Sequence, residues 1–217
     1  MNNRQKFKKT GIKSQERVKK HAEVFTPGWC VRDMIEMIIK NGEAFNKIDE
    51  TFLEPSCGDG NFIIQILERK IHIVESLFPT KEQYKILTLQ CVSSIYGIDI
   101  MPDNINECKE RVIRCLRKKY IKKYNEKMPV EHENNIRFIL DKNIILGNFL
   151  TDLTNKNEKI IIRKYDYTDE YVQVSDFYLS DIKENPEHNK PFVVYDKISI
   201  KDISNLGGVE VWLLKNI

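Results

Sequence analysis

The sequence predicts an α/β protein with a mainly parallel, doubly wound sheet and a strand-rich C-terminal part. A short apolar strand at 51–54 runs through a loop with two glycines into an amphipathic helix. Two further β-branched segments, 94–100 and 143–149, each follow a helical stretch, as strands joined by crossover helices do. Beyond residue 150, short alternating or apolar segments are separated by turn residues, which is typical of additional strands.

Length and composition restrict the class of protein. At 217 residues, with 41% hydrophobic and 31% charged residues, the chain suits one domain with a small appendage. No apolar run approaches the length of a membrane span, and the basic N-terminus lacks a hydrophobic signal segment, so we expect a cytoplasmic protein. The five cysteines form no C-x-x-C pair and the four histidines are scattered, so we expect reduced thiols and no metal site.

The first twenty residues are strongly basic, although the net charge of the chain is only +3. Eight lysines and arginines in this segment stand against the single acid Glu16. Basic residues on flexible chain give sequence-independent affinity for nucleic-acid phosphates, so the segment is a candidate DNA-contacting arm. The alternative is a solvated tail without a partner.

Thr26 and Pro27 predict the start of a helix, because Thr is a favourable N-cap and Pro a favourable first helical residue. The helix should run to about Asn41, with Gly42 as its stop. Its expected buried face contains Met34, Ile35, Ile38 and Ile39.

The loop after the first strand is the candidate ligand site. Gly58 and Gly60 lack a Cβ, so the backbone can take positive φ and a ligand can approach the main chain closely. Amide N–H groups at the start of the following helix then face the loop, where they favour negative charge. Pro55 ends the strand because it cannot donate to a ladder. The alternative is an ordinary turn between a strand and a helix.

Asp99 closes the second apolar strand. In a doubly wound sheet, an acid at this position accepts hydrogen bonds from the ribose hydroxyls of a nucleotide. It follows the loop by about 40 residues rather than roughly 20, because an extra helix with a Thr80–Gln83 capping box lengthens the crossover. The alternative is a helix cap, given Pro102 just after it.

The remaining segments are expected to be a helix at 102–124, a polar loop at 125–135, a short helix at 136–140 and the third strand. The first of these helices should bury Ile105, Cys108, Val112, Cys115 or Leu116, and Ile121. Its opposite face is basic, through Lys109, Arg111, Arg114, Arg117, Lys118, Lys119, Lys122 and Lys123. The C-terminal strands are expected at 159–163, 171–179, 192–198 and 209–213.

Three strings resemble motifs of the amino-group DNA methyltransferases, the N6-adenine enzymes of restriction–modification systems. Leu53-Glu54-Pro55-Ser56-Cys57-Gly58-Asp59-Gly60-Asn61-Phe62 resembles motif I, Glu23-Val24-Phe25-Thr26-Pro27 resembles motif X, and Tyr96-Gly97-Ile98-Asp99-Ile100 resembles motif II. The resemblance implies a Rossmann-like methyltransferase fold, S-adenosylmethionine as cofactor and DNA as partner. The residues that it implies at the cofactor are Phe25, Thr26, Pro27, Glu54, Pro55, Ser56, Cys57, Gly58, Asp59, Gly60, Phe62, Asp99, Ile100, Asn148 and Phe149.

Two departures from the family pattern concern the third and fourth motifs. In relatives, motif III carries an Asp that accepts from the cofactor's adenine amino group, and this chain has the neutral acceptor Asn148 instead. Motif IV, (D/N/S)-P-P-(Y/F), holds the target amine and stacks on the flipped-out base, and nothing at 150–217 spells it. The nearest strings are 164–167, without proline, and 184–188, with one proline and no aromatic residue.

The resemblance therefore covers about 17–150 and leaves the last third without a match. It divides the chain into a basic arm at 1–20, a cofactor-binding core at 21–150, and a segment at 151–217 that completes the sheet or forms an appendage. The first interpretation is an adenine-N6 DNA methyltransferase or the modification subunit of a restriction–modification system. The alternatives are a catalytically silent S-adenosylmethionine-binding subunit, with a companion specificity or catalytic subunit, and a methyltransferase that acts on another substrate.

Overall fold

The computed structural model describes residues 14–21, 26–40, 47–168, 170–208 and 211–213. Its elements in chain order are α2 (Gln15–His21), α3 (Gly28–Lys40), β1 (Phe52–Glu54), α4 (Asn61–Ser76), α5 (Lys81–Ser93), β2 (Ile95–Asp99), α6 (Pro102–Tyr124), α7 (Val130–Asn143), β3 (Ile144–Asn148), β4 (Leu153–Thr154), β5 (Ile161–Tyr167), β6 (Tyr171–Tyr178), α8 (Leu179–Glu184), β7 (Val193–Tyr195), β8 (Ile198–Ser199), η1 (Ile200–Gly208) and β9 (Val211–Leu213). The chain is therefore a mixed α/β protein, as the sequence predicted.

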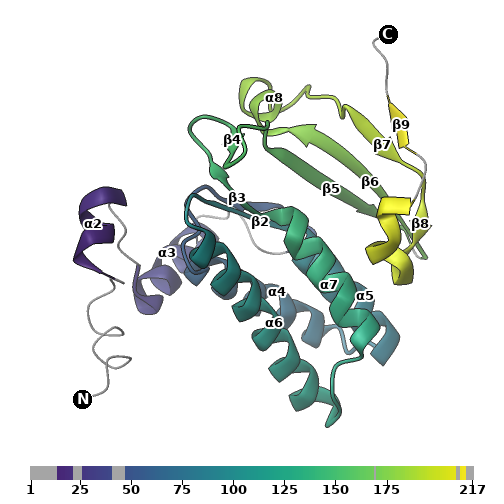
Figure 1. The fold of residues 1–217 in the computed structure, drawn as a ribbon. Helices are drawn as coiled ribbons and strands as arrows, with labels where there is room; N and C mark the ends of the chain where they lie inside the picture. Colours follow the sequence, from purple (N-terminus) through teal and green to yellow (C-terminus); the bar gives the residue numbers. More distant parts are fainter. Residues whose placement is uncertain (1–13, 22–25, 41–46, 169, 209–210, 214–217) are drawn as a thin grey trace.

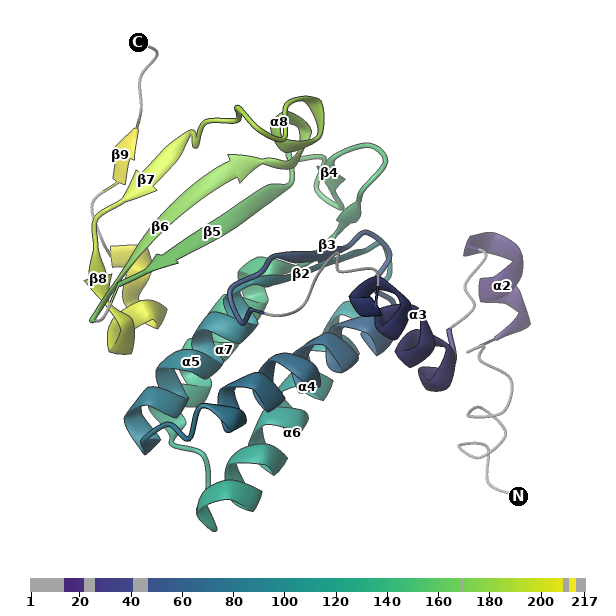
Figure 2. The same cartoon turned by 180° about the vertical axis from the view of Figure 1, so that it is seen from behind.

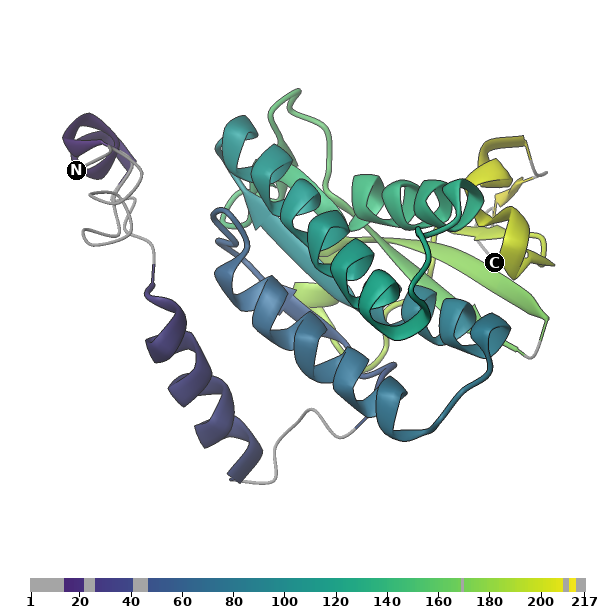
Figure 3. The same cartoon turned by 90° about the horizontal axis from the view of Figure 1, so that it is seen from below.

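The first sheet has the strand order β1-β2-β3-β4. β1, β2 and β3 are parallel, whereas β4 runs antiparallel to β3, so the sheet predicted to be mainly parallel is parallel over three strands only. The connecting helices α4, α5, α6 and α7 lie together on one side of this sheet (Figure 1; Figure 2). Figure 3 shows α3 alongside α4 at the margin of this helical layer, with α2 farther out.

The second sheet has the order β5-β6-β7-β9, with β8 paired to β6, and all of its pairs are antiparallel. It lies on the side of the first sheet away from the helices (Figure 1). Ile98 of β2 packs against Ile160 and Leu179, and the Tyr96 hydroxyl donates to the Arg163 carbonyl at 2.7 Å. The C-terminal segment thus adds β4 to the first sheet and covers that sheet's second face with a sheet of its own.

The helices bury most of the apolar residues expected on their inner faces, with two exceptions. On α6, Ile121 is 48% exposed and Tyr120 is buried instead, because position 120 continues the row of Cys108, Val112 and Leu116. On α3, Met34 is 45% exposed, whereas Val31 and Ile35 are buried.

The predicted loop at 125–135 is wrong over its second half, because α7 begins at Val130. Buried polar residues hid the helical period: the Asn135 amide donates to the Lys201 carbonyl at 2.8 Å and accepts from Ser204 N at 3.1 Å. These two bonds attach η1, an element that the sequence did not predict, to the side of α7.

Lys70 of α4 connects the segment before β1 to the end of α5. Its buried ammonium donates to the carbonyls of Ile48 and Glu50 and, at 2.8 Å, to the Ser94 hydroxyl. Burial lowers the pKa of this lysine to about 8. Because the three acceptors lie on two separate connections, Lys70 helps to fix the amino-terminal ends of β1 and β2 relative to each other.

His132 on α7 makes stability depend on pH. Burial, helped by the neighbouring Lys85, lowers the pKa of its imidazole from 6.5 to about 4, against a weaker opposing effect of Glu82. Between pH 6.5 and about 4 the unfolded chain binds a proton that the folded chain does not, so the free energy of unfolding falls as the pH falls. We predict that His132→Leu removes up to about 3 kcal/mol of this loss.

Urea denaturation at pH 7 and at pH 4.5 gives the free energy of unfolding at each pH. The change in this free energy between the two pH values is compared for wild type and variant. His188→Gln, in an exposed turn, is the matched control, and its free energy of unfolding should change with pH as that of the wild type does. Identical pH dependence in wild type and His132→Leu would contradict the assignment.

Candidate functional site

The three parallel strands bring the predicted site segments to one edge of the first sheet. β1 ends at Glu54, β2 at Asp99 and β3 at Asn148, and parallel neighbours end on the same side. The loop at 55–60, the turn at 99–101 and the residues at 148–149 therefore share this edge.

The glycine loop has the backbone conformation that its residues predicted. Gly58 has φ of 53° and Gly60 has φ of 92°, both in the left-handed region. A Cβ on Gly60 would lie 2.6 Å from the Cys108 sulfur, so a side chain at this position would displace Cys108 of α6. Both the conformation and the space favour glycine here.

Several amides of the loop bond within the protein rather than facing outward. Cys57 N donates to the Ile98 carbonyl, Gly60 N to the Cys57 carbonyl and Gly58 N to an Asp99 oxygen, each at 2.9 Å. The first α4 bond runs from Ile64 N to Gly60 O, so the amides at 61–63 precede it at the helix start. The amides that can donate hydrogen bonds to a bound anion are therefore those at the helix start. The amides in the first half of the loop fix the conformation of the loop.

Asp99 holds several segments together at this edge. Its carboxylate accepts from Gly58 N at 2.9 Å, from Met101 N at 2.8 Å and from the Asn104 amide at 3.3 Å. The residue is 8% exposed. A carboxylate offers about four acceptor positions, so roughly one remains for a ligand hydroxyl. Ile100, the next residue, is 49% exposed beside it.

Asn148 and Phe149 also have partners within the protein. The Asn148 amide oxygen accepts from Leu150 N at 2.9 Å, which closes a local turn. The Lys183 ammonium lies 4.7 Å from the centre of the Phe149 ring and donates to the Phe149 carbonyl at 3.0 Å. The oxygen expected to accept from an adenine amino group is thus already bonded in this structure.

The segment that resembles motif X reaches the loop through a hydrogen bond. The Asn61 amide donates to the Thr26 carbonyl at 3.0 Å, and the Pro27 carbonyl accepts from Val31 N at 3.1 Å as α3 begins. Phe62 is half-buried on α4 and packs against the core. Phe25, the aromatic residue of the motif, lies outside the described residues.

Two ionisable groups at this edge have perturbed pKa values. Burial raises the pKa of the Glu54 carboxyl, against an opposing hydrogen bond from the Ser56 backbone. The Cys108 thiol and burial raise the pKa of the Cys57 thiol, so Cys57 is a neutral packing residue rather than a nucleophile. Pro55 and Ser56 are exposed at the rim.

Two arginines at this edge were not expected there. Arg111 of α6 donates to the Asp59 carbonyl at 2.7 Å and to the Asn61 amide oxygen at 2.8 Å, and pairs with the Asp59 carboxylate at 2.7 Å. Arg17 of α2 pairs with Asp103 at 2.6 Å. Arg111 was assigned to the outward basic face. Arg111 lies three residues after Cys108, and residues at this spacing share a helix face, so the spacing could have indicated that Arg111 lies near the loop.

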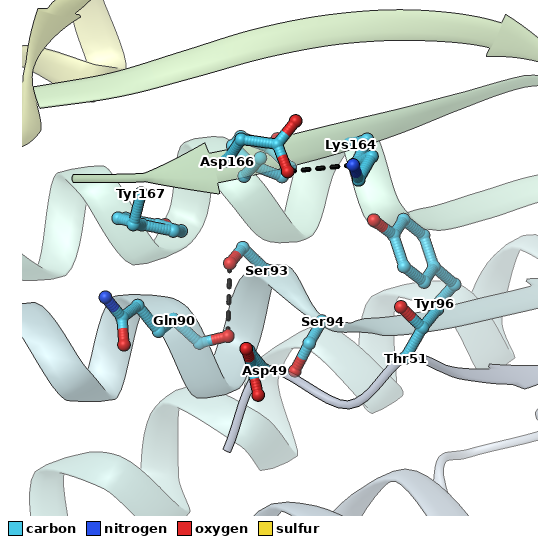
Figure 4. A pocket seen from close by; sticks show the side chains of 10 residues that line it. Asp49, Thr51, Gln90, Ser93, Ser94, Tyr96, Lys164, Asp166 and Tyr167 are labelled. Atoms are coloured by element: carbon cyan, nitrogen blue, oxygen red, sulfur yellow. Dashed lines mark hydrogen bonds and ion pairs between the residues drawn. The ribbon is translucent and has the colours of Figure 1, made fainter. Parts of the chain in front are cut away.

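Of the two strings nearest to a catalytic motif, residues 164–167 lie away from this edge. Residues 164–167 belong to β5, and they line a pocket of about 310 Å³ together with Thr51 and Ser94, which precede β1 and β2 (Figure 4). That pocket is at the opposite ends of the strands from the glycine loop. Residues 184–188 comprise the last residue of α8 and the turn after it, next to Lys183, whose ammonium donates to the Phe149 carbonyl.

No family model, curated protein or solved structure matches this chain. Within the described residues, no three His, Cys, Asp or Glu side chains are grouped so that they could hold a metal ion. No helix in the described part of the chain is both long and apolar enough to cross a membrane. The functional assignment therefore rests on the geometry of the strand edge and on the sequence motifs.

Gly60→Ala tests the fit of the loop on α6. The new Cβ would meet Cys108 and impose a left-handed conformation on a non-glycine residue, so we expect a loss of about 1–3 kcal/mol in unfolding free energy. Gly28→Ala is the matched control, because its Cβ would meet nothing within 4 Å. Urea denaturation of both variants gives the comparison, and an unchanged stability of Gly60→Ala would refute the close approach.

Proposed function

We propose that this protein binds S-adenosylmethionine at the carboxyl edge of β1–β3 and belongs to the adenine-N6 DNA methyltransferases or to the modification subunits of restriction–modification systems. The Rossmann-like methyltransferase fold is part of this proposal. The observation that carries it is the hydrogen bond between Gly58 N and Asp99, which joins the loop resembling motif I to the acid resembling motif II. Two motifs separated by about 40 residues thus meet at one place.

The chemistry of the residues at this edge fits the two ends of such a ligand. The remaining acceptor position of Asp99 suits a ribose hydroxyl, and exposed Ile100 offers an apolar surface for an adenine ring. Gly60 caps α4 without a side chain, so the helix start suits the carboxylate of an amino acid. Glu54, at the end of β1, supplies a carboxyl group for a cationic partner.

A bound S-adenosylmethionine supplies an electrophilic methyl group, and transfer then depends on an acceptor held in line with it. The residues of this chain contribute orientation and removal of water, which account for much of the rate in such reactions. No string at 150–217 spells the motif that holds the acceptor in the family that the sequence resembles.

DNA as the acceptor rests on the family resemblance and on the basic arm. The basic face of α6 supports it less, since several of its cations are in ion pairs. Arg114 pairs with Glu107, Arg117 with Glu133 and Lys109 with Asp141. Paired cations attract phosphates weakly.

The second candidate is a catalytically silent S-adenosylmethionine-binding subunit that works with a companion chain. The specific observation in its favour is the position of residues 164–167, at the end of the sheet opposite to the glycine loop. A string at that place could not hold a base next to a donor bound at the carboxyl edge.

Calorimetry with S-adenosylmethionine tests the proposed binding, and we expect micromolar affinity for the wild type. Asp99→Ala should weaken it by about tenfold or more, because a hydrogen bond to a charged group is lost. Asp166→Ala removes an exposed ion pair with Lys164 on β5 and is the control. Near-ultraviolet circular dichroism establishes that each variant is folded. Equal affinity in wild type and Asp99→Ala would reject this site.

Transfer of tritiated methyl groups to mixed DNA, RNA and protein separates the two candidates. Label on DNA supports the methyltransferase, and binding without transfer supports the silent subunit. Label on RNA or protein alone would reject DNA as the substrate.

A further inference from the structure

Arg111 of α6 contacts both the glycine loop and the start of α4. Its guanidinium donates to the Asp59 carbonyl and to the Asn61 amide oxygen, and it pairs with the Asp59 carboxylate, all at 2.7–2.8 Å. The side chain is 25% exposed, so water screens these contacts only in part. A planar guanidinium can make such a set at once, whereas an ammonium has no matching fork.

Asn61 extends this contact to the segment before α3. Its amide oxygen accepts from Arg111, while its amide nitrogen donates to the Thr26 carbonyl at 3.0 Å. The two partners fix the orientation of the amide, because a guanidinium can only donate and a carbonyl can only accept. The Asn61 amide therefore links Arg111 of α6 to the backbone of Thr26.

The helix that carries Arg111 also packs against the loop at a second residue. Cys108, one turn earlier on the same face of α6, lies directly under Gly60. The helix from Pro102 to Tyr124 thus contacts the loop at two residues, Cys108 and Arg111.

The site has two halves with separate supports. Asp99 is held through Gly58, Met101 and Asn104, whereas Arg111 holds Asp59, Asn61 and, through Asn61, Thr26. The Asp99 half corresponds to the nucleoside end of the proposed ligand, and the Arg111 half to its amino-acid end. Loss of one support should therefore affect one end of the ligand more than the other.

We propose that Arg111 is a positioning residue that holds the Thr26–Pro27 segment against the glycine loop and so sets the affinity for the amino-acid end of the methyl donor. The inference rests on the proposed function. It assigns Arg111 a role that a purely structural ion pair would not have, namely a selective effect on one part of the ligand.

Two thioether ligands give the test, because they share the nucleoside and differ in the amino-acid end. S-adenosylhomocysteine has this end and 5′-methylthioadenosine lacks it. We expect Arg111→Ala to lower the affinity for S-adenosylhomocysteine by about tenfold and the affinity for 5′-methylthioadenosine by less than about twofold. Arg111→Lys should fall between wild type and Arg111→Ala, because it keeps the charge and loses the fork.

Arg114→Ala is the matched control on the same helix, since Arg114 pairs with Glu107 on the exposed face. It should bind both ligands as the wild type does. If Arg111→Ala does not fold, Asn61→Ala carries the same test, because it removes the link to Thr26 and leaves the Arg111–Asp59 pair. The same selective loss is expected.

Equal weakening of the two ligands, or no weakening of either, would overturn the role of Arg111 while the wild-type binding still supported the proposed function. A wild type that binds neither ligand would instead overturn the proposed function, and this inference with it.

Discussion

The site depends on one hydrogen bond, from the Gly58 amide to the Asp99 carboxylate. The acceptor is charged and nearly buried, which makes the bond stronger than one between neutral groups in water. The same carboxylate also accepts from Met101 N and the Asn104 amide. One side chain therefore joins the loop after β1, the end of β2 and the start of α6, and the shape of this edge follows from that junction.

The second constraint is the close contact between the loop and α6. Gly60 can sit over Cys108 only because it lacks a Cβ, and Arg111 then lies beside Asp59 and Asn61. Sequence, helix register and loop conformation are thus coupled. A change of register in α6 would move both Cys108 and Arg111 away from the loop.

Local patterns predicted much of the fold, and long-range contacts explain most of what they missed. The capping box at Thr80, the length of α6 and the strands β2 and β3 follow from short-range signals, and the structure confirms them. The start of α7 was missed because Asn135 is polar and buried, bonded to η1 far along the chain. The sequence indicated the residues of the candidate site, but not that Asp99 and Asn148 would be bonded within the protein or that Arg111 would point inward. These features depend on hydrogen-bond partners that the spacing of residues in the sequence does not identify.

The central claim is that the carboxyl edge of β1–β3 binds S-adenosylmethionine. Titration of the ¹⁵N-labelled protein with this compound, followed by amide chemical shifts, tests it residue by residue. The account predicts the largest shifts at 57–64 and 99–101, with smaller ones at 148–149. Shifts confined to the residues of the pocket in Figure 4, or no shifts at saturating ligand, would contradict it.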